Sequence, residues 1–470
     1  MKYKDYELTI GLEVHAQLST RTKMFCSCKN ETDAEPNTNV CPICLAHPGT
    51  LPMINKHAIQ LGIRASLALN AKINMHSAFA RKHYFYPDLP KGYQITQYKY
   101  PLAENGYIDI KDKRIKIKRL HIEEDAGKLI HNKDATYADY NRAGVPLIEI
   151  VSEPQIHSVI DAYRYLKELR LILIYAGVTH GDMEKGEFRC EPNISIRRKG
   201  EPLGTRTEIK NLNSLKAVRD SIAYEVERQL KLLENNEKVV SVTLLYNEKS
   251  KKTEIMRKKE TAADYRYFPE PDLPELILTK DMIEKEKENI QLLPAHVREK
   301  YEKFNIDKDF IEVIVEDRKS RQFIENVLKV YNNPKSVVSW ILTDMRGYLK
   351  QTKQTLSSFN YKDIAELIKL MDSKKITKQH ATKALSFITK EHKPIEQLLK
   401  EQNLIIQEIS SKDKELIKKL LSLESEAVEK YKKGKKGIIG YLIGRVMSET
   451  KGKLSPSKVK EIVISLLEED

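Results

Sequence analysis

The chain has 470 residues, of which 40% are hydrophobic and 31% charged, and its formal net charge is +14 at pH 7. This composition excludes wholesale disorder and suits about three globular domains. No apolar run approaches the roughly 18 residues that span a bilayer, and the chain does not start with the apolar segment of a secretory signal. Five cysteines in so long a chain do not make a disulfide framework. We therefore expect a cytoplasmic protein with no membrane partner.

The first 294 residues contain short alternating runs separated by Gly and Pro, which predicts an α+β body with a mixed or antiparallel sheet. Residues 6–18 alternate between apolar and polar positions, as a half-buried strand does. Residues 188–197 alternate in the same way, and the turn that follows leads into 205–210, which predicts a hairpin. Residues 214–233 repeat apolar positions at helical spacing and predict an amphipathic helix.

Four cysteines form two close pairs, Cys26-x-Cys28 and Cys41-x-x-Cys44, joined by a twelve-residue loop. Paired thiolates at this spacing are typical of a structural zinc site, so we predict a zinc knuckle over 26–44. Four protein ligands leave no open position for a catalytic water. The alternative is that four reduced thiols only lie near one another.

Carboxylates and a histidine recur along the body, at Glu13, His15, 123–125, Glu149 and Glu153. The period of two puts Glu13 and His15 side by side on the polar face of one strand. Glu149 stands among apolar neighbours, so its charge must be neutralised, paired or bound to metal. Oxygen ligands with one imidazole suit Mg²⁺ or Mn²⁺, and such an ion usually serves a nucleotide phosphate. The alternative is a scatter of salt-bridge partners, and the sequence has no P-loop.

Basic side chains on the predicted hairpin are candidates for phosphate contacts, although a basic hairpin is more often only solvated. Our predicted cofactor-binding residues are Arg189, Asn193, Arg206 and Lys210. His83 and His121 stand alone in the sequence, and we expect them to be structural.

Composition changes near residue 295, after which Gly and Pro become sparse and apolar residues recur at helical spacing. We predict a helical bundle over 295–400 and a basic helical tail domain over 401–470. Residues 431–460 contain nine Lys or Arg and one Glu, which favours a polyanionic partner. The alternative is a lysine-rich proteome with solvated helix faces. Ser455-Pro456 is a suitable start for a last helix.

Several long strings resemble one family, the B subunit of the bacterial aspartyl/glutamyl-tRNA amidotransferase. They include Ile10-Gly-Leu-Glu-Val-His15, Arg81-Lys-His-Tyr-Phe-Tyr-Pro-Asp88, Leu120-His-Ile-Glu-Glu-Asp-Ala-Gly-Lys128 and Asn141-Arg-Ala-Gly-Val-Pro-Leu-Ile-Glu149, with further matches at 189–193, 204–213 and 264–273. The resemblance is dense over 5–275 and looser through the tail. It departs from the family at Glu191-Pro192 and at Leu245-Tyr-Asn247, which puts detailed ATP contacts there in doubt.

The resemblance implies that the body uses Mg-ATP to phosphorylate the side-chain carboxylate of Glu on tRNA(Gln) or of Asp on tRNA(Asn). Ammonia then displaces the phosphate; it comes from glutamine hydrolysed in a separate glutamine amidase partner, and a small linking protein completes a heterotrimer. The family's catalytic magnesium site maps onto His15, Glu124 and Glu149, with Glu13 beside them. For the tail, the resemblance implies a module that binds tRNA. The alternatives are a non-catalytic zinc-containing tRNA-binding scaffold and a synthetase-like ligase that releases AMP.

Overall fold

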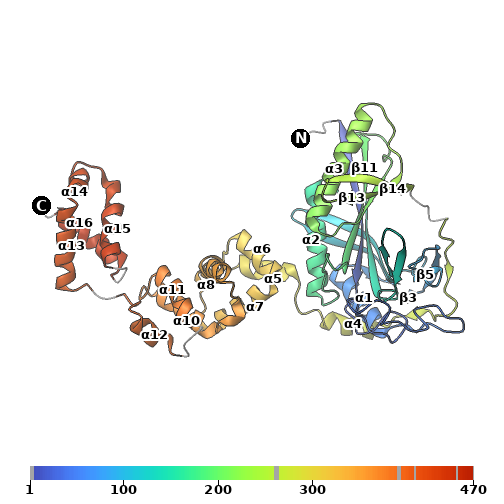
Figure 1. The fold of residues 1–470 in the computed structure, drawn as a ribbon, viewed down its shortest axis with the longest axis horizontal. Helices are drawn as coiled ribbons and strands as arrows, with labels where there is room; N and C mark the ends of the chain where they lie inside the picture. Colours follow the sequence, from blue (N-terminus) through green and yellow to red (C-terminus); the bar gives the residue numbers. More distant parts are fainter. Residues whose placement is uncertain (1–4, 259–263, 389–392, 407–408, 451–453, 469–470) are drawn as a thin grey trace. The chain divides into compact units, whose positions relative to one another are not determined.

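The computed structural model describes residues 5–258, 264–388, 393–406, 409–450 and 454–468. The chain divides into two compact units, Met1–Pro294 and Ala295–Asp470 (Figure 1). The division falls where the composition changes. The α+β body and the helical half predicted from the sequence are confirmed, whereas the finer boundary at 400 stays a prediction.

The first unit is built on a nine-stranded sheet with the order β14-β13-β12-β11-β1-β10-β7-β6-β2. Neighbouring strands are antiparallel except β12 and β13, which run parallel, so the sheet is mixed. The strands of this sheet are β1 (Tyr6–Gln17), β2 (Lys72–Ile73), β6 (Ala103–Ile110), β7 (Lys113–Glu124), β10 (Pro146–Ser152), β11 (Phe188–Arg198), β12 (Thr207–Lys210), β13 (Val242–Asn247) and β14 (Lys252–Lys258).

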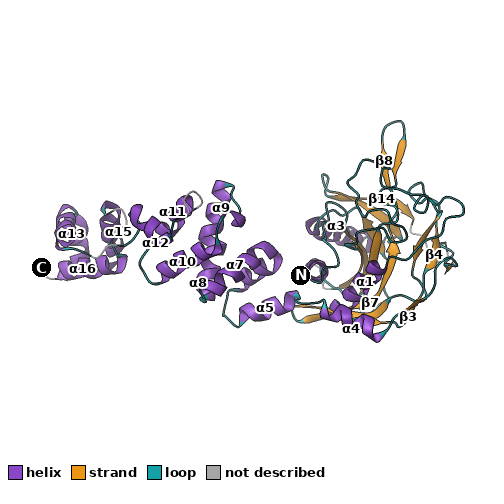
Figure 2. Cartoon of the chain, turned by 90° about the horizontal axis from the view of Figure 1, so that it is seen from below, coloured by secondary structure: helices purple, strands orange, loops and turns teal. Residues whose placement is uncertain are grey.

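Three helices pack against this sheet: α1 (Lys56–Ala68) on β7, α2 (Val159–Tyr175) on β6, and α3 (Leu215–Glu234) on β11. Figure 2 shows α1 beside β7. The alternation predicted for 6–18 is confirmed, because Ile10, Leu12 and Val14 are buried in the core. Since side chains alternate across a strand, Glu13 and His15 lie on the other face. The predicted hairpin and the helix over 214–233 are confirmed as β11–β12 and α3.

Small sheets and one helix complete the first unit. The three-stranded sheet β15-β4-β5 consists of β4 (Ala80–His83), β5 (Tyr93–Thr96) and β15 (Phe268–Pro269). The remaining elements are β3 (His76–Ser77), β8 (Lys128–His131), β9 (Thr136–Asp139), β16 (Leu276–Ile277) and α4 (Lys280–Glu288). Strand β5 contacts β7, which brings the three-stranded sheet beside the large one.

The named elements of the second unit are helices and 3₁₀ turns joined by loops. Its elements are α5 (Pro294–Glu302), α6 (Lys308–Glu316), α7 (Arg318–Val330), α8 (Pro334–Trp340), the π-helix η1 (Ile341–Met345), α9 (Arg346–Thr352), the 3₁₀ turn η2 (Leu356–Ser358), α10 (Tyr361–Asp372), α11 (Lys378–Ile388), α12 (Ile395–Glu401), α13 (Ser411–Leu423), α14 (Ser425–Lys432), the 3₁₀ turn η3 (Lys436–Ile438), α15 (Ile439–Glu449) and α16 (Pro456–Glu468).

The last four helices share a hydrophobic cluster of their own. Leu442 and Val446 of α15 are buried in it, as the helical spacing of the tail predicted. Helix α16 starts at Pro456, which confirms the predicted start at Ser455-Pro456. Lys451 and Lys453 of the predicted basic tail lie outside the described residues. Within the described part of the chain, no helix is long and apolar enough to cross a membrane.

Candidate functional site

A cavity of about 790 Å³ lies in the first unit, on the face of the large sheet that carries Glu13 and His15. Its lining comes from the large sheet, from β4 and β5, and from the segment that precedes β15. Its charged lining residues are Glu13, His15, Lys82, Asp88, Lys118, Arg119, His121, Glu123, Asp125, Glu149, Arg189, Glu191, Arg206, Glu208 and Lys210. Carboxylates gathered in one cavity require cations that balance their charge.

His15, Glu123 and Glu149 converge in this cavity, with possible ligand atoms all within 4.8 Å of one another. The His15 Nε2 lies 3.3 Å from a Glu123 oxygen and 3.4 Å from a Glu149 oxygen. Burial opposes protonation of His15, but hydrogen bonds to Glu123 and Glu149 and their charges outweigh it and raise its pKa to about 10. The two carboxylates therefore favour a positive charge between them. A divalent cation would displace the proton from His15, after which one nitrogen and two oxygens form a donor set that fits such an ion.

His121 is a member of this cluster that sequence reasoning missed. Its Nε2 lies 3.2 Å from Glu149 and 3.6 Å from Glu123. Burial again opposes protonation, yet the charge of Glu149 and hydrogen bonds to both carboxylates raise the pKa of His121. The expectation that His121 stands alone was wrong, because Glu149 of β10 pairs directly with His121 of β7 and with His15 of β1. The period of two between His121 and Glu123 is the signal that indicated a shared face.

Glu124 does not lie in this cluster, so its placement beside His15 and Glu149 was wrong. Its carboxylate accepts hydrogen bonds from Lys91 Nζ at 2.6 Å and from the backbone N–H of Ile95 at 3.0 Å. Adjacent strand residues point to opposite faces of a sheet, and Glu123 is the one that shares the face of His121. The sequence Glu123-Glu124 alone did not say which carboxylate faces the cavity.

A second acidic group, Glu13, Glu191 and Glu208, lies on the neighbouring strands β1, β11 and β12, with carboxylate oxygens within 4.8 Å of one another. Lys210 Nζ lies 2.8 Å from Glu191 and 3.6 Å from Glu208. The Asn193 side-chain amide donates to Glu13 at 2.9 Å. Three carboxylates this close to one another favour a cation between them.

The predicted cofactor-binding residues lie at or beside this cavity. Arg189, Arg206 and Lys210 line it, and Asn193 reaches Glu13 from β11. Arg189 is engaged by Asp125, with 3.0 Å between its guanidinium and the carboxylate. Arg206 is exposed. Their role as nucleotide contacts stays a prediction.

The sulfur atoms of Cys26, Cys28, Cys41 and Cys44 converge within 4.8 Å of one another, and none of the four lines the cavity. A hydrogen bond from Cys26 lowers the pKa of Cys44 to about 4, and burial raises the pKa of Cys28 to about 11. The buried Lys23 Nζ lies 3.8 Å from the Cys44 sulfur. Four soft donors beside a buried ammonium form a cluster that can hold a zinc ion.

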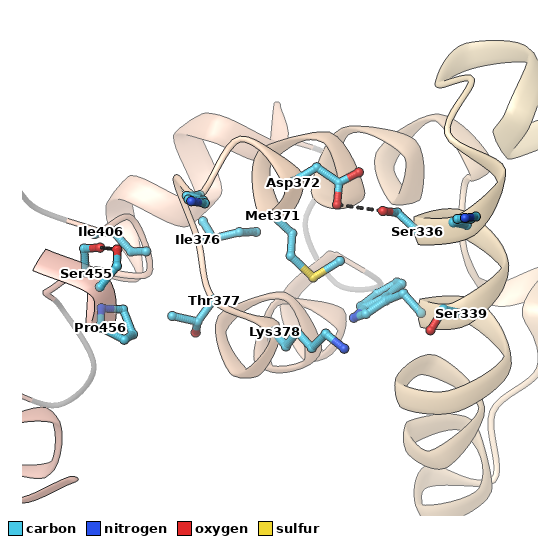
Figure 3. Close-up of a pocket in the computed structure, with 14 residues that line it drawn as sticks. Ser336, Ser339, Met371, Asp372, Ile376, Thr377, Lys378, Ile406, Ser455 and Pro456 are labelled. Atoms are coloured by element: carbon cyan, nitrogen blue, oxygen red, sulfur yellow. Dashed lines mark hydrogen bonds between the residues drawn. The ribbon is translucent and has the colours of Figure 1, made fainter. Parts of the chain in front are cut away.

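A second large cavity, of about 740 Å³, lies in the helical unit. Figure 3 shows Ser455 and Pro456 at one end and Ser336 and Ser339 at the other, and Ser336 donates a hydrogen bond to Asp372 at 2.9 Å. Asp372 also accepts hydrogen bonds from Tyr331 and Asn333. The lining of this second cavity includes no group of three metal-ligating side chains among the described residues. The clustered ionisable chemistry found in the described part of the chain therefore lies in the first unit.

Family models match both halves of the chain. Residues 8–284 match the GatB/GatE catalytic domain, and residues 322–467 match the GatB domain. The chain belongs to the GatB family. The match to the catalytic domain covers all of the residues that line the cavity of about 790 Å³.

Relatives match over nearly the whole length of the chain. A protein of Persephonella marina is 47% identical over 98% of this chain and 100% of its own length. One of Thermodesulfovibrio yellowstonii is 42% identical over 99% of this chain and 100% of its own. Both are named as the B subunit of an aspartyl/glutamyl-tRNA(Asn/Gln) amidotransferase. The similarity thus covers the catalytic body and the helical tail together.

Proposed function

We propose that this chain is the B subunit of a tRNA-dependent amidotransferase and phosphorylates the side-chain carboxylate of Glu on tRNA(Gln), of Asp on tRNA(Asn), or of both. The single observation that carries the proposal is the pairing of two adjacent acidic groups, His15–Glu123–Glu149 and Glu13–Glu191–Glu208, in one cavity of a chain of the GatB family. Ammonia then replaces the phosphate, which gives the amide.

In the first step a side-chain carboxylate oxygen attacks the γ-phosphorus of ATP, the bond from that phosphorus to the bridging oxygen breaks, and ADP leaves with the electron pair. The attacking carboxylate is already ionised, so no general base is needed. Both reactants are anions, and their repulsion is the obstacle that the site must remove. Magnesium held by His15, Glu123 and Glu149 supplies that neutralisation when bound.

Other residues of the chain hold the charged side chains of the cavity in position for this step. His121 binds Glu149 from the side and fixes its carboxylate, as groups beside metal ligands commonly do. Asp125 holds Arg189, and Glu191 holds Lys210, so both cations stay at the cavity. Arg189, Asn193, Arg206 and Lys210 remain our candidates for contacts to ATP.

The remaining parts of the proposal concern partners and compartment. Glutamine hydrolysis belongs to a separate glutamine amidase, since this sequence lacks the Gly-Ser-rich segment of an amidase nucleophile. A small linking protein completes a cytoplasmic heterotrimer, the helical tail binds the tRNA body, and the four cysteines hold a structural zinc ion.

Chromatography of the nucleotide product tests the proposal. The purified complex, given Glu-tRNA(Gln) or Asp-tRNA(Asn), glutamine and Mg-ATP, should release ADP in step with amide formation. Release of AMP would instead indicate a synthetase-like ligase. ATP consumption that does not depend on the mischarged tRNA would favour a tRNA-binding scaffold with carboxylates that only hold structure.

A further inference from the structure

Lys82 of β4 differs from the cations that contact the acidic groups of the cavity directly. Arg189 and Lys210 each form an ion pair with a carboxylate, at 3.0 and 2.8 Å. His15 is shared between two carboxylates. Within the described part of the chain, the Lys82 ammonium forms neither an ion pair nor a hydrogen bond, although its side chain lines the cavity and is half-buried.

Two aromatic rings hold the Lys82 ammonium in place. It lies 4.7 Å from the centre of the Tyr265 ring and 5.8 Å from that of Tyr84. Its neighbour Arg81 points the other way and is bound by Glu270 and Asp272, which anchors β4. Ring faces attract a cation without neutralising it, so the charge stays available to a ligand.

Lys82 lines the same cavity as His15, Glu123 and Glu149. Burial lowers the pKa of Lys82, but the charges of Glu123 and Glu149, with those of nearby tyrosines, raise it by more. The ammonium thus remains charged and lies within electrostatic reach of both carboxylates, yet too far for contact. The cavity that Lys82 and the cluster line together would therefore offer an anion two cations, a metal ion held by the carboxylates and a separate ammonium.

The reaction proposed above brings one anion of that kind to the cluster, the phosphoryl group that ATP transfers. We propose that Lys82 is a catalytic residue that binds the γ-phosphate of ATP and stays bound to it while it passes to the substrate carboxylate. This inference rests on the proposed function. The ammonium would add its positive charge to that of the metal ion, and the two together would offset the negative charges of the phosphoryl group and of the attacking carboxylate.

Binding of two nucleotides to the purified complex tests this contact, because only one of them carries a γ-phosphate. The probes are Mg-ADP and the magnesium complex of an ATP analogue with nitrogen between its β- and γ-phosphorus atoms. The variants are Lys82→Met, which keeps the length of the side chain, and Lys82→Arg, which keeps its charge. Lys99→Met is the matched control, since Lys99 is an exposed lysine beside the Tyr100 ring and outside the cavity.

Lys82→Met should weaken binding of the ATP analogue about tenfold or more, the usual effect of losing one hydrogen bond between charged groups. Binding of ADP should change by less than about twofold, which also shows that the variant is folded. Amide formation by Lys82→Met should fall about a hundredfold, as it does when one donor to a developing charge is removed. Lys82→Arg should recover part of both losses, and Lys99→Met should match the wild type.

Three results would overturn the inference. Equal losses for ADP and the analogue would mean that Lys82 acts on the nucleotide as a whole or on the fold. Unchanged binding of both, with wild-type amide formation, would remove Lys82 from the reaction. Weaker binding of Glu-tRNA(Gln) alone would assign the ammonium to the substrate carboxylate. A wild-type complex that binds neither nucleotide would overturn the proposed function itself.

Discussion

Charged residues are used in opposite ways in the cavity of the first unit and in the tail helices of the second. In the cavity, Glu123 and Asp125 are buried and held by named partners. In the described part of the tail, the lysines are exposed, and those with partners, such as Lys433 with Glu429, pair one helical turn away at the surface. Buried pairs fix atoms for chemistry, whereas exposed charges attract a polyanion at long range and are screened by salt.

Loss of zinc should have the largest effect and should be confined to the body. Cys41→Ser removes one of the four sulfur ligands, and structural zinc contributes on the order of 10 kcal/mol to folding where it is bound. We expect about one zinc per wild-type chain and a lowered melting temperature for the variant. Cys190→Ser is the control for zinc content, because Cys190 is buried in the core and lies outside the cluster. Elemental analysis with less than about 0.2 zinc per chain would contradict the assignment.

Substitutions of the carboxylates in the cavity should lower amide formation and leave glutamine hydrolysis by the partner largely intact. Glu149→Gln or Glu123→Gln should lower amide formation about a thousandfold, since each removes a metal ligand from the transition state. Glu124→Gln is the informative comparison. It breaks the pair with Lys91 and should lower the melting temperature, while Mn²⁺ binding followed by EPR should persist.

The opposite outcome for these carboxylates would reverse the site assignment. Near wild-type amidation by Glu123→Gln, together with loss of Mn²⁺ by Glu124→Gln, would restore the order that the family resemblance implied. Wild-type amidation by both Glu123→Gln and Glu149→Gln would place the chemistry outside this cavity.

Sequence reasoning reached what depends on local periodicity and missed what depends on strand pairing. The alternation around Leu12 and the spacing of the cysteines act within one element, so they predicted β1 and the cysteine cluster directly. His121 and Glu208 enter the site only because β7 and β12 lie next to other strands of the sheet. No local pattern states that register. Lys82 escaped attention for the same reason, because β4 belongs to a separate sheet that packs beside β7 through β5.

Neutralising the tail should change binding and leave the chemistry unaffected. Lys432, Lys435, Lys436 and Lys458 are exposed, and their joint replacement by Gln should weaken tRNA binding. The salt dependence of binding should flatten by about 0.7–0.9 in slope for each phosphate that the variant no longer neutralises. Affinity for ATP should stay the same. Fluorescence titrations of tRNA at several salt concentrations measure this slope.

A lysine control gives the tail experiment its specificity. Lys285→Gln with Lys287→Gln changes two exposed lysines on α4 of the first unit. If this double variant flattens the salt dependence of tRNA binding by as much per lysine as the tail variant does, the change results from the lower net charge of the protein and not from lost contacts of the tail. An unchanged slope in the tail variant would exclude the tail as the element that holds tRNA.

We expect the smallest effect from replacing a serine that caps a helix with alanine, once in each unit. Ser214 caps α3 and Ser410 caps α13, each by accepting a hydrogen bond from the backbone N–H three residues on. Replacing either serine with Ala should cost about 1 kcal/mol locally. Helix α3 is packed on β11, so Ser214→Ala should lower the stability of the whole body slightly and leave amidation intact. Helix α13 has only Ile417 and Leu421 buried, so Ser410→Ala should instead raise hydrogen exchange over 411–423 selectively. Equal, global exchange in both variants would show that the tail is as cooperative as the body, which would remove the contrast between a rigid site and a surface that only attracts.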